Sequence, residues 1–285
     1  MKKTLIILFS LIFVLPFFIG CEEDDTPTAP DLPPYGSMAI DFSNFTVNSK
    51  SLNDLNKLFA EGDFKTSTNY EFAAGHVGFW SLLLTVTLAV PVASFYASFQ
   101  HTPTYLGNNK WQWTYDVTGF ATTHTARLTG MLRTSDIKWE MYITRTGVGA
   151  YPEFKWFEGI SNLDDNSGQW ILYHSYDFQD ELLQIDWTKS GDDIGEITYT
   201  YVRELDNNNE TDLFNGSYIT YGLQSDYFDA YYFIHFYNIW TSQFVDIDIE
   251  WSTTEYYGHV KAEHKFGDTD WHCWDDYGVD IDCTN

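Results

Sequence analysis

The chain has 285 residues, 19% of them aromatic, and 41 acidic against 15 basic residues give it a formal net charge of −26. So many aromatic side chains can bury a large core, which excludes disorder over most of the length. The acidic excess repels phosphate backbones and no basic patch offsets it, so we expect no nucleic-acid partner. The length fits a single large all-β domain.

The N-terminus has the layout of an export signal, with two lysines followed by the apolar run LIILFSLIFVLPFFIG. Gly20 followed by Cys21 resembles the lipobox of bacterial lipoproteins, in which the signal is cut before a cysteine that becomes the lipidated N-terminus. Phe18 and Ile19 depart from the leucine and the small residue that are usual there. The resemblance covers residues 1–21 and implies that a lipid on Cys21 anchors the protein in a membrane.

Residues 21–37 read as an acidic, proline-rich tether that is too poor in apolar residues to pack. The run EEDD at 22–25 resembles the acidic signal that sends lipoproteins of Bacteroidota-type bacteria to the outside of the outer membrane. Residues 1–20 are therefore expected to be a signal peptide, and residues 38–285 a single β-rich domain exposed at the cell surface.

A helical segment is expected at about residues 51–101, after a short strand at 38–45. Its first part, SLNDLNKLFAEG, has leucines at helical spacing. Its second part, about residues 77–99, is apolar and carries no Asp, Glu, Lys or Arg. This part is long enough to span a membrane, but Pro91 and the recurring serines and threonines favour a kinked helix buried against a sheet.

Residues 110–267 show repeated alternation of apolar and polar side chains, which is typical of half-buried antiparallel strands. The clearest case is FVDIDIEW, where Val245, Ile247, Ile249 and Trp251 point one way. Turn sequences such as DDNSG and SGDD separate the runs. We predict a mainly β fold, an antiparallel meander of about 10–12 strands closed as an up-and-down barrel or folded as a sandwich. The apolar helix would be an N-terminal insertion that plugs it.

The C-terminal tail, residues 268–285, contains Cys273 and Cys283. Two remaining cysteines in an oxidising compartment usually pair, so we predict a disulfide that closes this tail. The alternative is a metal site that combines Cys273 with nearby histidines, although the spacing follows no zinc pattern.

The strand DIDIEW resembles the E-x-D-x-E strand of laminarinase-type glycoside hydrolases. By that resemblance Asp246 would be the nucleophile, Asp248 the helper and Glu250 the acid/base, the pair of carboxylates that glycosidic cleavage needs. Asp246 departs from the glutamate expected of the nucleophile. The alternative, which the acidic composition favours, is a solvated strand face.

The loop DNNNETD places Asp206, Asn208, Glu210 and Asp212 at alternate positions, as the oxygen ligands of a calcium loop would be. It lacks the glycine at the sharp turn and a carboxylate at the twelfth position, so a simple polar loop is the favoured interpretation. No other cofactor is indicated.

Aromatic residues on both faces of YYFIHFYNIW, residues 231–240, could stack on sugars, line a cavity for a small apolar ligand or mark an interface with a protein partner. We therefore expect an anchored surface protein that binds a small molecule, a glycan or a partner without catalysis. The alternatives are a carbohydrate-active hydrolase that uses Asp246, Asp248 and Glu250, and a structural component of the cell surface.

Overall fold

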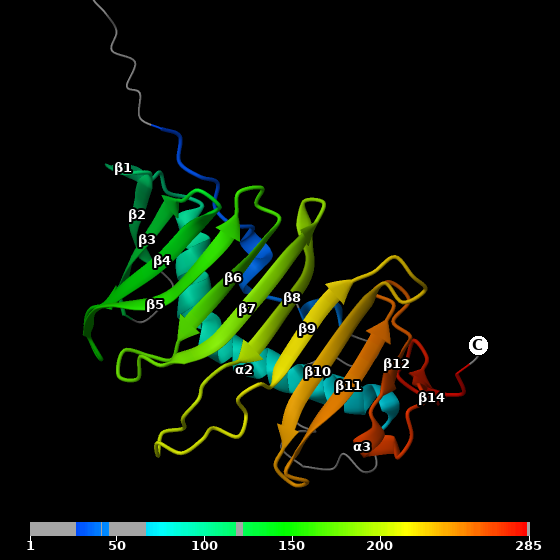
Figure 1. Cartoon of the computed structure of the whole chain (residues 1–285). Helices are drawn as coiled ribbons and strands as arrows, with labels where there is room; N and C mark the ends of the chain where they lie inside the picture. The colour runs from blue at the N-terminus through cyan, green and yellow to red at the C-terminus, as the bar shows by residue number, and fades with distance from the viewer. Residues whose placement is uncertain (1–26, 41, 46–66, 118–121, 284–285) are drawn as a thin grey trace, which may run out of the picture.

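Every strand of the chain pairs with the next strand in sequence, always antiparallel, so that the strands build one meandering sheet. The structure is a computed structural model that describes residues 27–40, 42–45, 67–117 and 122–283. Within these residues the sheet has 14 strands in the order β1 to β14 (Figure 1). The strands are Thr104–Gly107 (β1), Lys110–Val117 (β2), His124–Leu132 (β3), Asp136–Arg145 (β4), Tyr151–Asn162 (β5), Ser167–Tyr173 (β6), Glu181–Ser190 (β7), Asp193–Tyr201 (β8), Tyr218–Leu223 (β9), Ala230–Asn238 (β10), Gln243–Trp251 (β11), Gly258–Lys261 (β12), His272–Trp274 (β13) and Asp280–Ile281 (β14).

The alternation in the sequence correctly predicts which side chains enter the core. On β7, Leu183, Ile185 and Trp187 are buried, whereas the side chains between them face away from the core. The fold class is therefore confirmed as a mainly β antiparallel meander with an apolar helix near its N-terminus. The strand number exceeds the expected one because β1, β12, β13 and β14 are too short to show a clear alternation.

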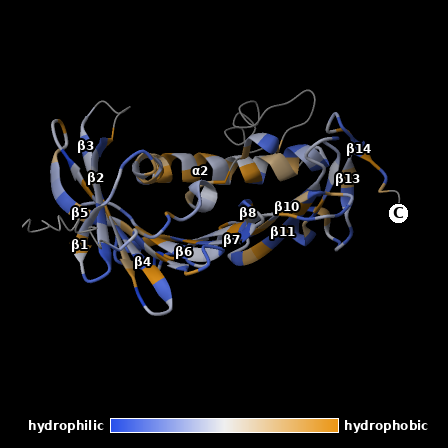
Figure 2. Cartoon of the chain, turned by 90° about the horizontal axis from the view of Figure 1, so that it is seen from above, coloured by the Kyte–Doolittle hydropathy of each residue, from blue (hydrophilic) through white to orange (hydrophobic). Residues whose placement is uncertain are grey.

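The sheet is open, so the expectation of a closed barrel or a sandwich is not met. Its order ends at β1 on one side and β14 on the other, and no pairing of these two strands closes it. Seen from above, the sheet curves around the long helix α2 (Figure 2). We call the face toward α2 the inner face and the opposite face the outer face. Because the edge strands have only four and two residues, they leave few backbone groups unpaired.

Helix α2, Asn69–Ser98, begins with a capping box in which Thr68 and Glu71 satisfy each other's backbone N–H groups. The helix continues through Pro91, and it contacts β2 and β3 at one end of the sheet and β12 and β13 at the other. The helix therefore reaches from one end of the sheet to the other. The expected first helical part, at residues 51–62, lies outside the described residues.

Helix α2 is buried on the side that faces the sheet and exposed on the other. Leu84, Leu88 and Phe95 are buried, whereas Leu82 and Val86 are exposed. Among the described residues α2 is the one helix that could cross a membrane by length and composition, and 39% of its most apolar window is buried. Its buried side packs on the sheet, as expected for a helix beneath a sheet.

Residues 27–40 and 42–45 pack along the inner side of the sheet rather than forming the later part of a free tether and a strand; residues 21–26 of the expected tether lie outside the described residues. Ala29 and Leu32 are half-buried against the core, and the ring of Tyr35 stacks on Tyr96 of α2 with centroids 3.6 Å apart. Two 3-10 turns, η1 (Tyr35–Met38) and η2 (Phe42–Asn44), replace the expected strand. The prolines that suggested a tether also suit a chain that crosses a surface without pairing to it.

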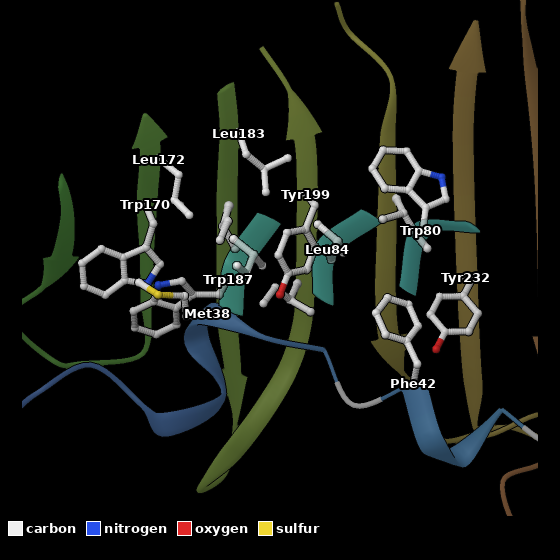
Figure 3. Packing of buried hydrophobic residues seen from close by; sticks show 14 of the residues in the cluster. Met38, Phe42, Trp80, Leu84, Trp170, Leu172, Leu183, Trp187, Tyr199 and Tyr232 are labelled. Atoms are coloured by element: carbon white, nitrogen blue, oxygen red, sulfur yellow. The ribbon is translucent and has the colours of Figure 1, made fainter. Parts of the chain in front are cut away.

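The core lies between α2, this N-terminal segment and the inner face (Figure 3). Met38 and Phe42 come from the segment, and Trp80 and Leu84 come from α2. They meet side chains of the strands, among them Trp170, Leu172, Leu183, Trp187, Tyr199 and Tyr232. The aromatic composition therefore serves mainly the core.

The C-terminal tail extends the sheet. After β12 come the short helix α3 (Glu263–Phe266), β13 and β14, and Cys273 forms the predicted disulfide with Cys283, their Cα atoms 5.3 Å apart. Asp280 and the carbonyl of Cys273 accept hydrogen bonds from the backbone N–H and the side-chain amide of Asn69. The tail thus fastens the last strand to the start of α2.

Candidate functional site

The three carboxylates expected of a hydrolase do lie on one face of one strand, the outer face of β11. Register places each opposite a basic side chain or a histidine of a neighbouring strand. Asp246 bonds to His235 at 2.6 Å, Asp248 to Lys261 at 2.6 Å and Glu250 to His259 at 2.7 Å. Asp248 and Lys261 stabilise the sheet as opposite charges on facing positions do, whereas the two histidines are hydrogen-bonded to their carboxylates across the strands.

The surroundings of these pairs are aromatic. The ring of His235 stacks on Phe244, with centroids 4.7 Å apart, and on Tyr218 at 5.1 Å. His259 stacks on Trp271 at 3.7 Å; burial lowers the pKa of His259, and Glu250 opposes that effect. The rings stack on one another and flank the carboxylates along the outer face.

The expected calcium loop folds differently from a metal site. Asp206 accepts hydrogen bonds from the backbone N–H groups of Asn208 and Glu210, whereas Asp212 accepts from the hydroxyl of Tyr201 and from the N–H of Phe214. No group of three or more His, Cys, Asp or Glu side chains within the described part of the chain is arranged to hold a metal ion. The acidic side chains of this loop therefore hold the loop's own backbone. Cys21 lies outside the described residues.

A shallow hollow of about 350 Å³ lies on the outer face over β4–β8, and we call it the polar hollow. Most of its lining residues carry hydrogen-bonding side chains on neighbouring strands, and Ile160 and Trp187 contribute apolar surface. The polar ones include Asn162, Ser167, Gln169, Asp186, Glu196 and Thr198. Gln169, Asp186 and Glu196 point outward because each is next to a core residue in its strand, as Asp186 is between Ile185 and Trp187.

Asp186 is the centre of the hydrogen bonding in the polar hollow. It accepts from the side-chain amide of Gln169 at 2.7 Å and from that of Gln184 at 2.6 Å. An amide side chain carries two donor hydrogens and an acceptor oxygen, so one bond to Asp186 leaves each glutamine further capacity. Carboxylate, amide and hydroxyl groups together can pair with a ligand that both donates and accepts.

Tyr231 borders the polar hollow through an arrangement that depends on a glycine. Gly222 lies between Glu196 and Tyr231 in the sheet register, and a Cβ at Gly222 would lie 2.2 Å from the hydroxyl oxygen of Tyr231. With no side chain there, Tyr231 reaches across β9 and donates to Glu196 at 2.5 Å. Burial and the bond to Glu196 raise the pKa of Tyr231, so it remains a neutral donor.

A second, larger hollow of about 740 Å³ lies between the β6–β7 and β8–β9 loops. Arg203, almost fully buried, donates to Asp180 at 2.6 Å and to Asn207 at 2.7 Å. Burial acts to lower the pKa of Arg203, but the bonds to Asp180 and Tyr201 outweigh it and raise the pKa. The guanidinium joins the two loops, so its role here is structural.

Sequence reasoning found the carboxylates of β11 but missed the polar hollow. Gln169, Asp186 and Glu196 are ordinary outward positions in their own strands, and only register brings them together. The one local signal was Gly222, an isolated glycine in a strand pattern that marks a close approach by another side chain. Comparison with protein-family models, curated proteins and solved structures gave no match.

Proposed function

We propose that the protein is a lipid-anchored cell-surface protein that binds a glycan in the polar hollow without chemical turnover. The observation that carries the proposal is the hydrogen-bonding wall around Asp186, built on strands rather than on loops. A glycan offers many hydroxyl groups that donate and accept, which suits such a wall, whereas an apolar ligand would leave these polar groups unpaired.

The charge of the polar hollow narrows the glycan class. Asp136, Asp186 and Glu196 contribute three carboxylates to its lining, and Arg133 pairs with Asp136. Acidic sugars would meet like charges there, so we propose a neutral or amino-bearing glycan. The acidic surface as a whole supports the same selection.

Affinity electrophoresis of the purified protein in gels that contain a polysaccharide tests binding. A neutral glucan should retard the protein, and alginate should not. Gln169→Ala/Asp186→Ala should abolish the retardation. The matched control is Gln112→Ala/Asp116→Ala, which removes the same two kinds of side chain from the outer face of β2 and should leave retardation unchanged.

The catalytic alternative rests on the row of carboxylates on β11. Assaying the same purified protein and polysaccharides for the release of reducing ends tests it. Release of reducing ends that disappears in Glu250→Gln would replace our proposal with a hydrolase. We expect no release, because each carboxylate is bonded to a neighbour on an open strand face.

The anchoring part of the proposal depends on Cys21 alone and has a separate test. Cys21→Ala should abolish labelling by a fatty-acid analogue and release the protein from membranes, whereas Cys283→Ala should do neither. Continued labelling of the Cys21 variant would refute the lipid anchor. The acidic run 22–25 can be tested by replacing its four residues with asparagines. If the variant is no longer cleaved by protease added to intact cells, the run directs the protein to the cell surface.

A further inference from the structure

We propose that the β10–β11 hairpin and the adjacent β8–β9 loop form an apolar tip that inserts into the interfacial layer of a lipid bilayer. The apolar tip consists of Leu213, Phe214, Ile239, Trp240 and Phe244. This proposal goes beyond glycan binding, and it rests neither on the polar hollow nor on the lipid at Cys21.

The side chains of the apolar tip are unusually accessible. Trp240 is 88% exposed, more than any other large apolar side chain within the described ranges, and Ile239 is 53% exposed. Leu213, Phe214 and Phe244 are also exposed. The hairpin lies at the end of its strands (Figure 1), so these side chains project into solvent rather than covering a core.

The apolar tip is held together by hydrogen bonds and ring contacts. The side-chain oxygen of Asn238 accepts hydrogen bonds from the N–H groups of Trp240, at 2.9 Å, and Thr241, at 3.3 Å. The hydroxyl of Ser217 accepts from the N–H of Tyr237, which joins the two loops. The ring of Tyr237 lies between those of Phe214 and Phe244, with centroids 6.5 and 5.4 Å away. Because the loops are already ordered, insertion would cost little conformational entropy.

The apolar tip also carries no formal charge, in a chain whose net charge is −26. No Asp, Glu, Lys or Arg occurs from 213 to 225 or from 230 to 245. Asp212, just before the first of these stretches, is buried and accepts hydrogen bonds from Tyr201 and Phe214. Asp246, the next carboxylate after Phe244, is bonded to His235, and the five side chains of the apolar tip can themselves enter the interface without desolvating an ion.

The shape and composition favour a bilayer over a protein partner. A projecting hairpin would need a matching groove on a protein, whereas a bilayer accommodates it without one. Trp240 with neighbouring Asn238 and Thr241 is the combination of amphipathic ring and polar groups found at the headgroup level. Since the acidic surface would be repelled by anionic lipids, the bilayer should be zwitterionic.

The test places a nitroxide at Thr241→Cys in the full-length protein, reconstituted in phosphatidylcholine vesicles. This position leaves Trp240 in place, the disulfide keeps Cys273 and Cys283 from the label, and Cys21→Ser in every labelled protein removes the third cysteine. The label should collide more with oxygen than with a water-soluble nickel chelate. The same label at Ser225→Cys, in the loop at the other end of β10, should show the reverse.

The matched variant adds Ile239→Ser/Trp240→Ser to the labelled protein. Both side chains are exposed, so the unfolding midpoint should not change, but shielding from nickel should be lost. Three results would overturn the proposal. The label at 241 could be as accessible to nickel as the label at 225, or its shielding from nickel could persist in the double variant. It could also be shielded from nickel and oxygen alike, which would indicate contact with a protein.

Discussion

At the scale of single residues, His76 on α2 connects the packing of the core to pH. Its ring lies 4.6 Å from that of Phe72 and 5.3 Å from that of Phe236, between centroids, and its Nδ1 donates to the Phe72 carbonyl. Burial lowers the pKa of His76 to about 4. The unfolded chain, with a pKa near 6.5 for this group, therefore takes up the proton first as pH falls.

Stability should accordingly decline between about pH 6.5 and pH 4, and the His76 share of the loss should approach about 3 kcal/mol. Chemical denaturation at a series of pH values measures it. In His76→Phe the contribution of His76 to this loss should vanish, so the free energy of unfolding should depend less steeply on pH between pH 6.5 and pH 4. An unchanged slope would mean that His76 is not held neutral by the fold.

Gly159 lies where the large ring of Trp170 packs directly against the backbone of the neighbouring strand. A Cβ there would lie 2.3 Å from the Trp170 ring and 2.4 Å from the Gln169 carbonyl oxygen. Gly159→Ala should therefore lower the free energy of unfolding by about 1–3 kcal/mol, or more if the backbone cannot move.

The comparison for Gly159 is Gly191→Ala, where nothing lies within 4 Å of the added carbon but φ is +67°. That variant should cost only about 1 kcal/mol, from backbone strain. Equal losses in urea unfolding would show that crowding at Gly159 is not the cause.

At the same scale, the sequence predicts which residues share a face but not which residues meet. Alternation alone places Asp246, Asp248 and Glu250 together on β11. Their partners His235, Lys261 and His259 lie on other strands, and pairing them requires the register of β10, β11 and β12. The polar hollow was missed for the same reason.

At the scale of elements, the meander and the apolar helix follow from patterning, whereas closure of the sheet does not. Whether a curved sheet closes depends on the space its helix fills, and α2 reaches β2 and β3 as well as β12 and β13. Thr68 and Glu71 have the residue types and the spacing of a capping box, so the start of α2 at Asn69 could have been predicted from the sequence.

The Cys273–Cys283 disulfide holds the last element in place. Cys273→Ser/Cys283→Ser should lower stability by about 2–3 kcal/mol, because the bridge restricts a short loop of the unfolded chain. Since Asp280 and Cys273 accept hydrogen bonds from Asn69, amide exchange at the start of α2 should also accelerate. Adding reductant to the wild type should reproduce both effects and should leave the variant unchanged; a reductant effect on the variant would contradict this.

At the scale of the whole molecule, the fold separates a covered face of the sheet from an uncovered one. The inner face is occupied by α2 and residues 27–40 and 42–45, and our proposal places ligand binding on the outer face. There the polar hollow is built on adjacent strands that the core side chains hold rigid. On our proposal, the acidic excess from which we expect no nucleic-acid partner would also disfavour acidic ligands at this face.

The central claim, glycan binding in the polar hollow, is tested most directly by a crystal structure with the neutral oligosaccharide that retards the protein most. We predict sugar density over β6–β8, with ring hydroxyls within hydrogen-bonding distance of Asp186 and Gln169. Sugar density on the carboxylates of β11 or in the hollow around Arg203, with the polar hollow empty, would contradict the account.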